Sequence, residues 1–356
     1  MLKQIFFVFL LNICLQNCCL SDKEIFENKN ILITGGTGFL GRALIEEILK
    51  YNPNQITVFS RDEVKHFNIT KLFNNNEKIK NVIGDVRDYN ALFNATKNVD
   101  IAIHAAALKR IDDVEKNVSE SIKTNIIGSL NLFNVCTHNR VKKVVFVSTD
   151  KACSPINTYG ACKFISEKIF TNYERQNSQT KFVVVRYGNV LESTGSVIPI
   201  FSEKILKGED IPLTDENMTR FIINKNEAVE LIFDAIKYGI GGEIFSRKLP
   251  SMKIVDLIEI LKEKFKANNK IKIIGLRPGE KIHEILINES EILRAYTFDN
   301  KYVITPCIKE WFNFDNESVP VYIKKGKALK EIFLKDYSSG DSVIDKKLLE
   351  KLIEIK

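Results

Sequence analysis

Tyr159 and Lys163 are the two residues whose types and spacing suggest chemistry most directly, because they stand four positions apart in the stretch STDKACSPINTYGACK. If a helix begins at Asn157, both side chains lie on one face of it. A lysine ammonium beside a phenol favours the phenolate and lowers the pKa of the tyrosine. Tyr159 is therefore a candidate to accept a proton from a hydroxyl group while a hydride leaves the same carbon.

A polar triplet, Thr149-Asp150-Lys151, precedes this pair and directly follows the apolar run Val144–Val147. The run predicts a buried strand, and open α/β sheets place their chemistry at the carboxyl ends of such strands. Tyr-x-x-x-Lys by itself is also found on solvated helix faces. The strand and the triplet together favour an active site.

A glycine-rich turn lies near the start of the chain, in ILITGGTGFLGRALIEEILK. An apolar strand, Ile31–Ile33, leads into Gly35, Gly38 and Gly41, and an amphipathic helix follows. The three glycines permit a tight turn, a close approach of a pyrophosphate, and close helix–strand packing. This context predicts a dinucleotide site that also includes Thr37, Phe39 and Leu40, although a turn without a nucleotide is the alternative.

The second predicted strand, Ile56–Phe59, ends in Ser60 and Arg61, where an NAD site commonly has an acidic residue for the ribose. An arginine offers forked donors to a 2′-phosphate. We therefore predict NADP as the cofactor. Two alternatives stay open. Asp62 is an acidic residue that would suit the ribose of NAD, and Arg61 on a solvent-exposed turn would contact no cofactor.

Two further strands complete the predicted cofactor site. VIGDVRD (82–88) brings Asp85 and Val86 to the adenine edge, and the small residues that begin at Ala105 let the dinucleotide lie close to the backbone. Lys109 is a candidate to contact cofactor phosphates or substrate, or is a surface lysine, whereas His104 is predicted to be a core histidine. Strand and helix alternate at least five times, which predicts a doubly wound parallel sheet.

The composition is that of a globular protein of 356 residues with a net charge of +7 spread along the chain. Because no basic block is interleaved with aromatics, we expect no nucleic-acid partner. Seven cysteines without metal-ligand spacing predict no metal site and fit a reducing, cytoplasmic compartment. Residues 1–20 resemble a signal peptide without a clean cleavage site, so any membrane contact is expected there, through an extension or a peripheral anchor.

The motifs together resemble one family of extended short-chain dehydrogenases/reductases, the C5-inverting UDP-N-acetylglucosamine 4,6-dehydratases of pseudaminic acid synthesis. The resemblance covers roughly residues 29–310. Sugar-nucleotide 4-epimerases usually carry Ser-Ser or Ser-Thr where this chain has Asp150-Lys151, and dTDP-glucose 4,6-dehydratases carry Asp-Glu. The segments that carry the resemblance are TGGTGFLG, HAAALK, STDK, YGACK, RYGNV, PLTDENMTRF and GLRPGEKIHEILI.

The resemblance implies an NADP-dependent lyase that acts on UDP-N-acetylglucosamine and gives UDP-2-acetamido-2,6-dideoxy-beta-L-arabino-hex-4-ulose. It implies that Tyr159 takes the O4 proton, Lys151 removes the C5 proton, and Asp150 protonates the leaving 6-hydroxyl. Thr149 orients the C4 oxygen, and Lys163 holds the cofactor ribose. We also expect a homo-oligomer.

The sequence departs from the family in two places that bear on the cofactor turn and the second lobe. Phe39-Leu40 stands where the family often has Ser-Phe, so backbone must replace a side-chain contact to phosphate. Thr194 stands where arginine is common. Neither departure touches Thr149-Asp150-Lys151 or Tyr-x-x-x-Lys.

The predicted organisation is an NADP-binding domain over residues 29–187, to which residues 225–247 return, and an interleaved substrate lobe over 188–310. Residues 1–28 are an N-terminal extension, and residues 311–356 carry no motif. In the substrate lobe, Asn189 is placed to bridge cofactor and substrate, and Arg220 and Arg277 suit a diphosphate. Glu280 and His283 are further candidates, or residues of a loop-to-helix cap.

Two other functions stay open at this point. A retaining 4,6-dehydratase or a 4-epimerase would use the same cofactor and differ in the configuration of the product at C5 or C4. A non-catalytic NADP-binding protein is possible on the same fold. An intact acid–base set argues against the second alternative.

Overall fold

The computed structural model describes residues 21–171, 179–191, 197–308 and 319–353. The signal-like segment 1–20 and Thr194 therefore lie outside the described residues. No helix within the described ranges is long and apolar enough to span a membrane.

One large sheet forms the centre of the molecule, and its described strands run in the order β16-β14-β15-β10-β6-β5-β4-β1-β2-β3. The seven from β10 to β3 pair in parallel, and β15, β14 and β16 continue the sheet antiparallel. The expected doubly wound α/β fold is confirmed. The strands are β1 (Asn30–Thr34), β2 (Gln55–Ser60), β3 (Ile79–Ile83), β4 (Ile101–His104), β5 (Lys143–Val147), β6 (Lys181–Val185), β10 (Ile244–Arg247), β14 (Ala295–Phe298), β15 (Lys301–Ile304) and β16 (Lys327–Ala328).

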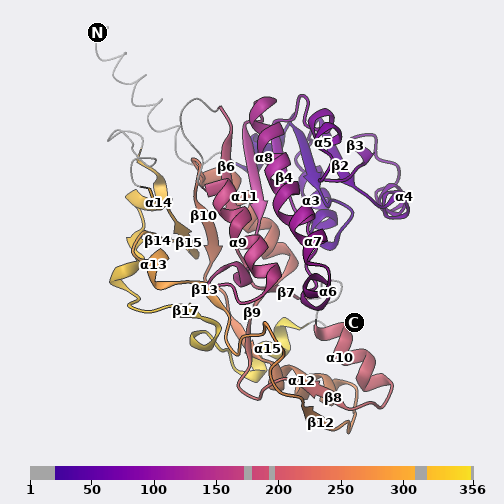
Figure 1. Ribbon diagram of the computed structural model, residues 1–356, viewed down its shortest axis with the longest axis vertical. Helices are drawn as coiled ribbons and strands as arrows, with labels where there is room; N and C mark the ends of the chain where they lie inside the picture. The colour runs from indigo at the N-terminus through magenta and orange to yellow at the C-terminus, as the bar shows by residue number, and fades with distance from the viewer. Residues whose placement is uncertain (1–20, 172–178, 192–196, 309–318, 354–356) are drawn as a thin grey trace.

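Helices cover both faces of this sheet (Figure 1). On one face α11 (Lys225–Tyr238) packs against α3 (Phe39–Leu49), β5 and β6. On the other face α8 (Gly128–His138) packs against α9 (Thr158–Thr171) and α5 (Tyr89–Ala95). Strands that are covered on both faces become continuous apolar runs, as β5 and β6 are, because neither face meets water.

The strand order reverses between β1 and β4, and ligands of open α/β sheets bind at such a switch point. The glycine turn leaves β1 there and enters α3. Gly35 has φ +68° and lies so close to β4's exit that an added Cβ would meet the backbone of Ala106 at 2.8 Å. Only glycine combines this backbone conformation with this close approach.

The helical segment over residues 118–138 is interrupted. It consists of α7 (Val118–Ser121), a π-helical stretch over Ile122–Ile127, and α8. Such a bulge re-aims side chains and occurs often at functional sites. Here the stretch contains Thr124, which lines the cavity at the switch point.

The second lobe has a hydrophobic core of its own, at the bottom of Figure 1. Residues from α10 (Val197–Leu206), β8 (Ile211–Leu213), β9 (Thr219–Ile223) and α12 (Ile254–Lys264) build this core. β9 lies between β7 (Asn189–Val190) and β11 (Ser251–Lys253), which connects this lobe to the end of the first domain. A short parallel pair joins β8 to β12 (Ile271–Ile273).

The C-terminal part of the chain is integral to both lobes, which the sequence did not indicate. Residues 295–304, assigned to the substrate lobe, form β14 and β15 of the large sheet. Farther on, β17 (Tyr337–Ser338) pairs with β13 (Ile285–Ile287), and α15 (Lys346–Leu352) packs on α12. The described residues 319–353 therefore connect the two lobes, because β16 pairs within the large sheet and β17 pairs with β13.

Candidate active site

A cavity of about 1330 Å³ opens at the carboxyl ends of the central strands and reaches the second lobe. Of the residues expected at the site, Asp85, Asp150, Arg220 and His283 do not line it. Those that do are Gly35, Thr37, Gly38, Phe39, Leu40, Gly41, Ser60, Arg61, Val86, Ala105, Lys109, Thr149, Lys151, Tyr159, Lys163, Asn189, Arg277 and Glu280.

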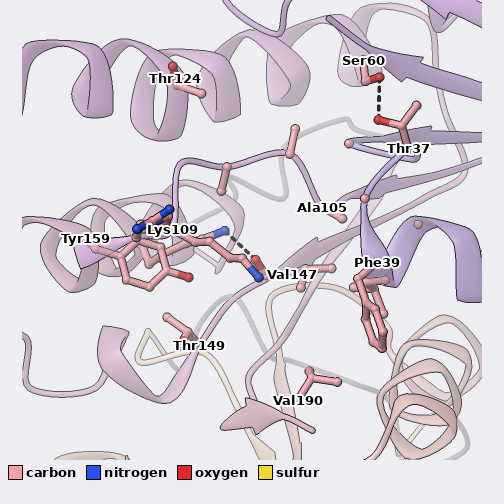
Figure 2. A pocket seen from close by; sticks show the side chains of 18 of the residues that line it. Thr37, Phe39, Ser60, Ala105, Lys109, Thr124, Val147, Thr149, Tyr159 and Val190 are labelled. Carbon is pink, nitrogen blue, oxygen red and sulfur yellow. Dashed lines mark hydrogen bonds between the residues drawn. The ribbon is translucent and has the colours of Figure 1, made fainter. Parts of the chain in front are cut away.

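A chain of hydrogen bonds fixes the ribose end of this cavity. The hydroxyl groups of Thr37 and Ser60 lie 2.9 Å apart (Figure 2), and His66 Nε2 lies 3.0 Å from Ser60 Oγ. His66 Nδ1 in turn lies 2.9 Å from Asn81 Oδ1. These hydrogen bonds join the glycine turn to the end of β2 and to Asn81 within β3, so a ligand meets a preformed surface.

Arg61 lies at this end with its side chain half-exposed, and its Nη1 is 3.4 Å from Asp85 Oδ2. Asp85 also pairs with Arg87 at 2.6 Å, so its carboxylate holds two guanidinium groups and does not reach the cavity. Asp62, the acidic alternative, caps helix α4 (Glu63–Leu72) by accepting a hydrogen bond from Lys65 N. The strand end thus presents the Ser60 hydroxyl and the Arg61 guanidinium to the cavity, and Asp62, which caps α4, lines it as well.

The cavity fits a dinucleotide on two observations. The hydroxyl oxygens of Thr124 and Ser148 are buried at its wall and have no partner within the described residues. Buried polar groups of this kind are normally satisfied, so a ligand with donors and acceptors suits them. The glycine turn also brings Gly35, Gly38 and Gly41 to the cavity wall, where no side chain keeps a ligand from the backbone.

His104 takes no part in the cavity. Its ring nitrogens lie 2.6 Å from Thr34 Oγ1 and 3.2 Å from Ser129 Oγ, and burial lowers its pKa to about 3. The predicted core histidine is confirmed.

The helix α9 presents Tyr159 and Lys163 together, as their spacing predicted. Asn157 caps this helix, with its Oδ1 accepting from Gly160 N at 2.7 Å. Lys163 Nζ donates to Val147 O at 2.7 Å and lies over the ring of Phe146. Burial lowers the pKa of Lys163 to about 8.

The electrostatics of Tyr159 differ from the expectation. Burial raises the pKa of Tyr159 to about 12, and the cation that opposes this rise is Lys151, not Lys163. The reason is geometric: Lys163 turns to the carbonyl of Val147, whereas Lys151 and Thr149 share the cavity wall with the phenol.

Asp150 and Lys151 form the charged centre of the site. Lys151 Nζ lies 3.0 Å from Asp150 Oδ1 and 3.3 Å from Asn189 Oδ1. Asp150 is fully buried; its Oδ1 also accepts from Thr149 Oγ1, while Oδ2 has no partner among the described residues. Lys151 reaches the cavity, and Asp150 lies directly behind it.

Glu284 completes this centre, and sequence reasoning missed it. Its Oε1 lies 3.4 Å from Lys151 Nζ and 3.9 Å from Arg220 Nε, and the side chain is 5% exposed. The one feature of the sequence that pointed to Glu284 is its place at the end of RPGEKIHE, the run that contains the candidates Glu280 and His283. This run leads into strand β13, so a loop-to-helix cap is wrong.

The two arginines expected to bind a diphosphate, Arg220 and Arg277, lie in different environments in the structure. Arg220 is buried, and its Nη1 donates to the carbonyls of Thr219 and Ile282, so it holds the wall and does not face the cavity. Arg277 does line the cavity, half-exposed, 3.7 Å from Asp112 and 3.8 Å from Glu280.

A glycine turn at the switch point of a doubly wound sheet, with Tyr-x-x-x-Lys and an acid–base pair in the same cavity, defines an extended short-chain dehydrogenase/reductase. The family model described as "Polysaccharide biosynthesis protein" matches residues 31–306, and the chain belongs to this family. The resemblance given by the sequence motifs is thereby confirmed.

Individual relatives narrow the comparison. The chain is 44% identical over 333 residues to a UDP-N-acetylglucosamine 4,6-dehydratase (inverting) of Campylobacter jejuni, covering 91% of this chain and 97% of that protein. It is 42% identical to a UDP-glucose 4-epimerase of Rickettsia bellii, covering 89% and 92%. A solved structure of Pen from Bacillus thuringiensis superposes with a TM-score of 0.82 at 37% identity, covering 92% of this chain and 97% of that one.

Proposed function

We propose that the protein is a C5-inverting UDP-N-acetylglucosamine 4,6-dehydratase that uses NADP. The observation that carries the proposal is the Asp150–Lys151 pair, 3.0 Å apart beside Tyr159 at the cavity, because a dehydration needs both an acid and a base. The 44% identical relative of that activity supports the same conclusion.

The residues of the ribose end favour NADP over NAD. Arg61 supplies a guanidinium for a 2′-phosphate, Ser60 replaces the usual carboxylate, and Asp62 is engaged as a helix cap. The glycine turn would hold the pyrophosphate, and Lys163 the ribose of the nicotinamide end. A bound NADP+ would supply the hydride acceptor for C4 of the sugar and the hydride donor for C6.

The protein's own groups move the protons of this reaction. Tyr159 takes the proton of the 4-hydroxyl, with Thr149 orienting that oxygen. The resulting ketone acidifies the C5–H bond, and Lys151, which reaches the cavity, removes this proton. Asp150, which lies behind Lys151, would turn toward the cavity to give a proton to the 6-hydroxyl, which leaves as water. A proton returned to C5 on the opposite face completes the inversion.

The diphosphate of the substrate would lie at the mouth of the cavity. Arg277 and Lys109 both line it there, and a guanidinium and an ammonium suit phosphate oxygens. Burial lowers the pKa of Lys109, and a phosphate beside it would raise that pKa again. Arg220 is left out of this set because it is turned into the wall.

A 4-epimerase is the second candidate, and the 42% identical Rickettsia bellii relative favours it. An epimerase returns the hydride to C4 and needs no base for C5. Lys151 at the cavity, 3.0 Å from a buried carboxyl group, therefore favours the dehydratase.

We further propose a cytoplasmic homo-oligomer, since nucleotide sugars and NADP are cytoplasmic. Exposed apolar side chains on neighbouring helices, Ile122, Leu130 and Ile165, support self-association. The product would enter the synthesis of a pseudaminic acid-type sugar.

Incubation of the purified protein with UDP-N-acetylglucosamine and NADP+ in D2O, followed by NMR of the product, tests the function. We expect a 4-keto-6-deoxy sugar with deuterium at C5 and the L-arabino configuration. An unchanged C5 hydrogen with inversion at C4 would establish the epimerase instead.

A further inference from the structure

Glu284 has no role in the reaction as written above, yet it lies against the group proposed as the C5 base. Its carboxylate is 3.4 Å from Lys151 Nζ, on a segment that belongs to the second lobe. Both side chains are shielded, with Lys151 16% exposed and Glu284 5% exposed. A buried carboxylate is costly unless it is paired, so this placement requires an explanation.

The backbone of Glu284 is held on both sides by one residue of the C-terminal stretch. Ser339 Oγ accepts from Glu284 N at 2.9 Å, and Ser339 N donates to Glu284 O at 2.8 Å. Ser339 Oγ also lies 2.6 Å from Thr219 Oγ1, and its carbonyl accepts from Ser251 Oγ. This clamp fixes where the carboxylate can lie relative to Lys151.

The number of protons that Lys151 and Asp150 carry together determines how the fixed carboxylate of Glu284 could act on them. A base that is a neutral amine and an acid that is a neutral carboxyl share one proton between them. Lys151 Nζ is 3.0 Å from Asp150 Oδ1, so passing one proton breaks an N–H bond and forms an O–H bond. The ammonium–carboxylate pair thereby becomes the amine and the acid together, without any proton from solvent.

We propose that Glu284 is a positioning residue that holds Lys151 beside Asp150 and keeps one shared proton on this pair. The inference rests on the proposed dehydratase function, which needs both the base and the acid in one turnover. Ser339 and the C-terminal stretch serve the site by holding Glu284.

The charges that face the pair support this role. Burial alone would lower the pKa of Lys151, but the carboxylates of Asp150 and Glu284 outweigh burial and the charge of Arg220 and raise it. Burial raises the pKa of Asp150, and Glu284 adds to the rise against the opposing effect of Lys151. Tyr159 is a further titratable group that faces the pair, and burial raises its pKa to about 12. Glu284 thus favours the protonated form of both partners.

The test is the pH dependence of kcat/KM in Glu284→Gln, which removes the charge and keeps the shape. An opposite charge this close shifts a pKa by about 1–3 units, so we expect the alkaline fall of kcat/KM to move down by about that much. The alkaline fall moves to lower pH because, without the negative charge of Glu284, Lys151 and Asp150 lose their shared proton at lower pH. Glu284→Asp keeps the charge at greater distance and should show a smaller shift in the same direction. Glu289→Gln makes the same chemical change at an exposed position and should leave the profile unchanged.

A second measurement tests the role of Glu284 independently of the proposed dehydratase activity. The 13Cε shift of Lys151 in lysine-labelled protein, assigned with Lys151→Ala, reports its charge without turnover. We expect Lys151 to titrate at lower pH in Glu284→Gln than in the parent. Identical titrations and profiles in the parent, Glu284→Gln and Glu284→Asp would overturn the role of Glu284. A parent protein that makes no product would overturn only the dehydratase assignment, because the titration still reports on the pair.

Discussion

The two ends of the cavity are built in different ways. The cofactor end comes from short local units, in which one strand, one turn and one helix place the glycines of 35–41, and neighbouring strand ends place Ser60 and Ala105. The acid–base end is assembled from segments far apart in the chain: Asp150 and Lys151 after β5, Asn189 at β7, and Glu284 before β13. A local unit fixes geometry through backbone conformation, whereas the assembled end depends on how two lobes pack.

A buried ion network holds the assembled end in place. Arg186 bonds Glu167 of α9 at 2.6 Å, and Glu291 of α13 (Glu289–Ile292) at 2.8 Å and 2.9 Å. Burial alone would raise the pKa of Glu291, but the charge of Arg186 outweighs it and lowers the pKa to about 2. Helix α9 and the segment after Glu284 are therefore both held by the guanidinium of Arg186.

The largest expected effect is at the assembled end. Lys151→Ala should lower turnover by about 10²–10⁴-fold, because a proton-transfer group is lost. NADP+ affinity should stay close to that of the parent, since the cofactor end is built independently. The measurements are steady-state kinetics, cofactor titration and deuteration at C5. Parent-like C5 deuteration in Lys151→Ala would remove Lys151 from the base role.

A glycine pair tests the local end. Gly35 and Gly208 have nearly the same φ, +68° and +70°, but only Gly35 faces backbone within 4 Å. Replacement by alanine should cost about 1–2 kcal/mol of unfolding free energy at each through backbone strain. Gly35→Ala should cost about 1–3 kcal/mol more through overpacking and should also lose NADP+ binding. Denaturant unfolding and cofactor titration measure both effects; equal losses at the two positions would contradict the close approach.

The smallest expected effect concerns the choice of cofactor. Arg61→Ala should narrow the preference for NADP+ over NAD+ by about tenfold, because a hydrogen bond to a charged group contributes about 1.5–3 kcal/mol and this side chain is half-exposed. Titration of both cofactors into parent and variant measures the ratio. Arg140→Ala, at an exposed arginine that does not line the cavity, is the control and should leave the ratio unchanged. Equal affinities in the parent would show that Arg61 does not select the cofactor.

The sequence by itself determined the doubly wound sheet, the glycine turn, the helix that carries Tyr159 and Lys163, and the strand end that carries Asp150 and Lys151. Each follows from apolar periodicity, glycine geometry or helical spacing, which act over a few residues. The family resemblance added the activity, which no local pattern states.

Only the tertiary structure decided the partners of these groups. Burial, not the neighbouring Lys163, governs the pKa of Tyr159, and Arg220 turns into the wall because the carbonyl of Ile282 is its partner. Glu284 reaches Lys151 only because Ser339 holds its backbone and the C-terminal stretch folds back on the second lobe. Burial and pairing between distant segments depend on the whole packing, and no spacing along the chain encodes them.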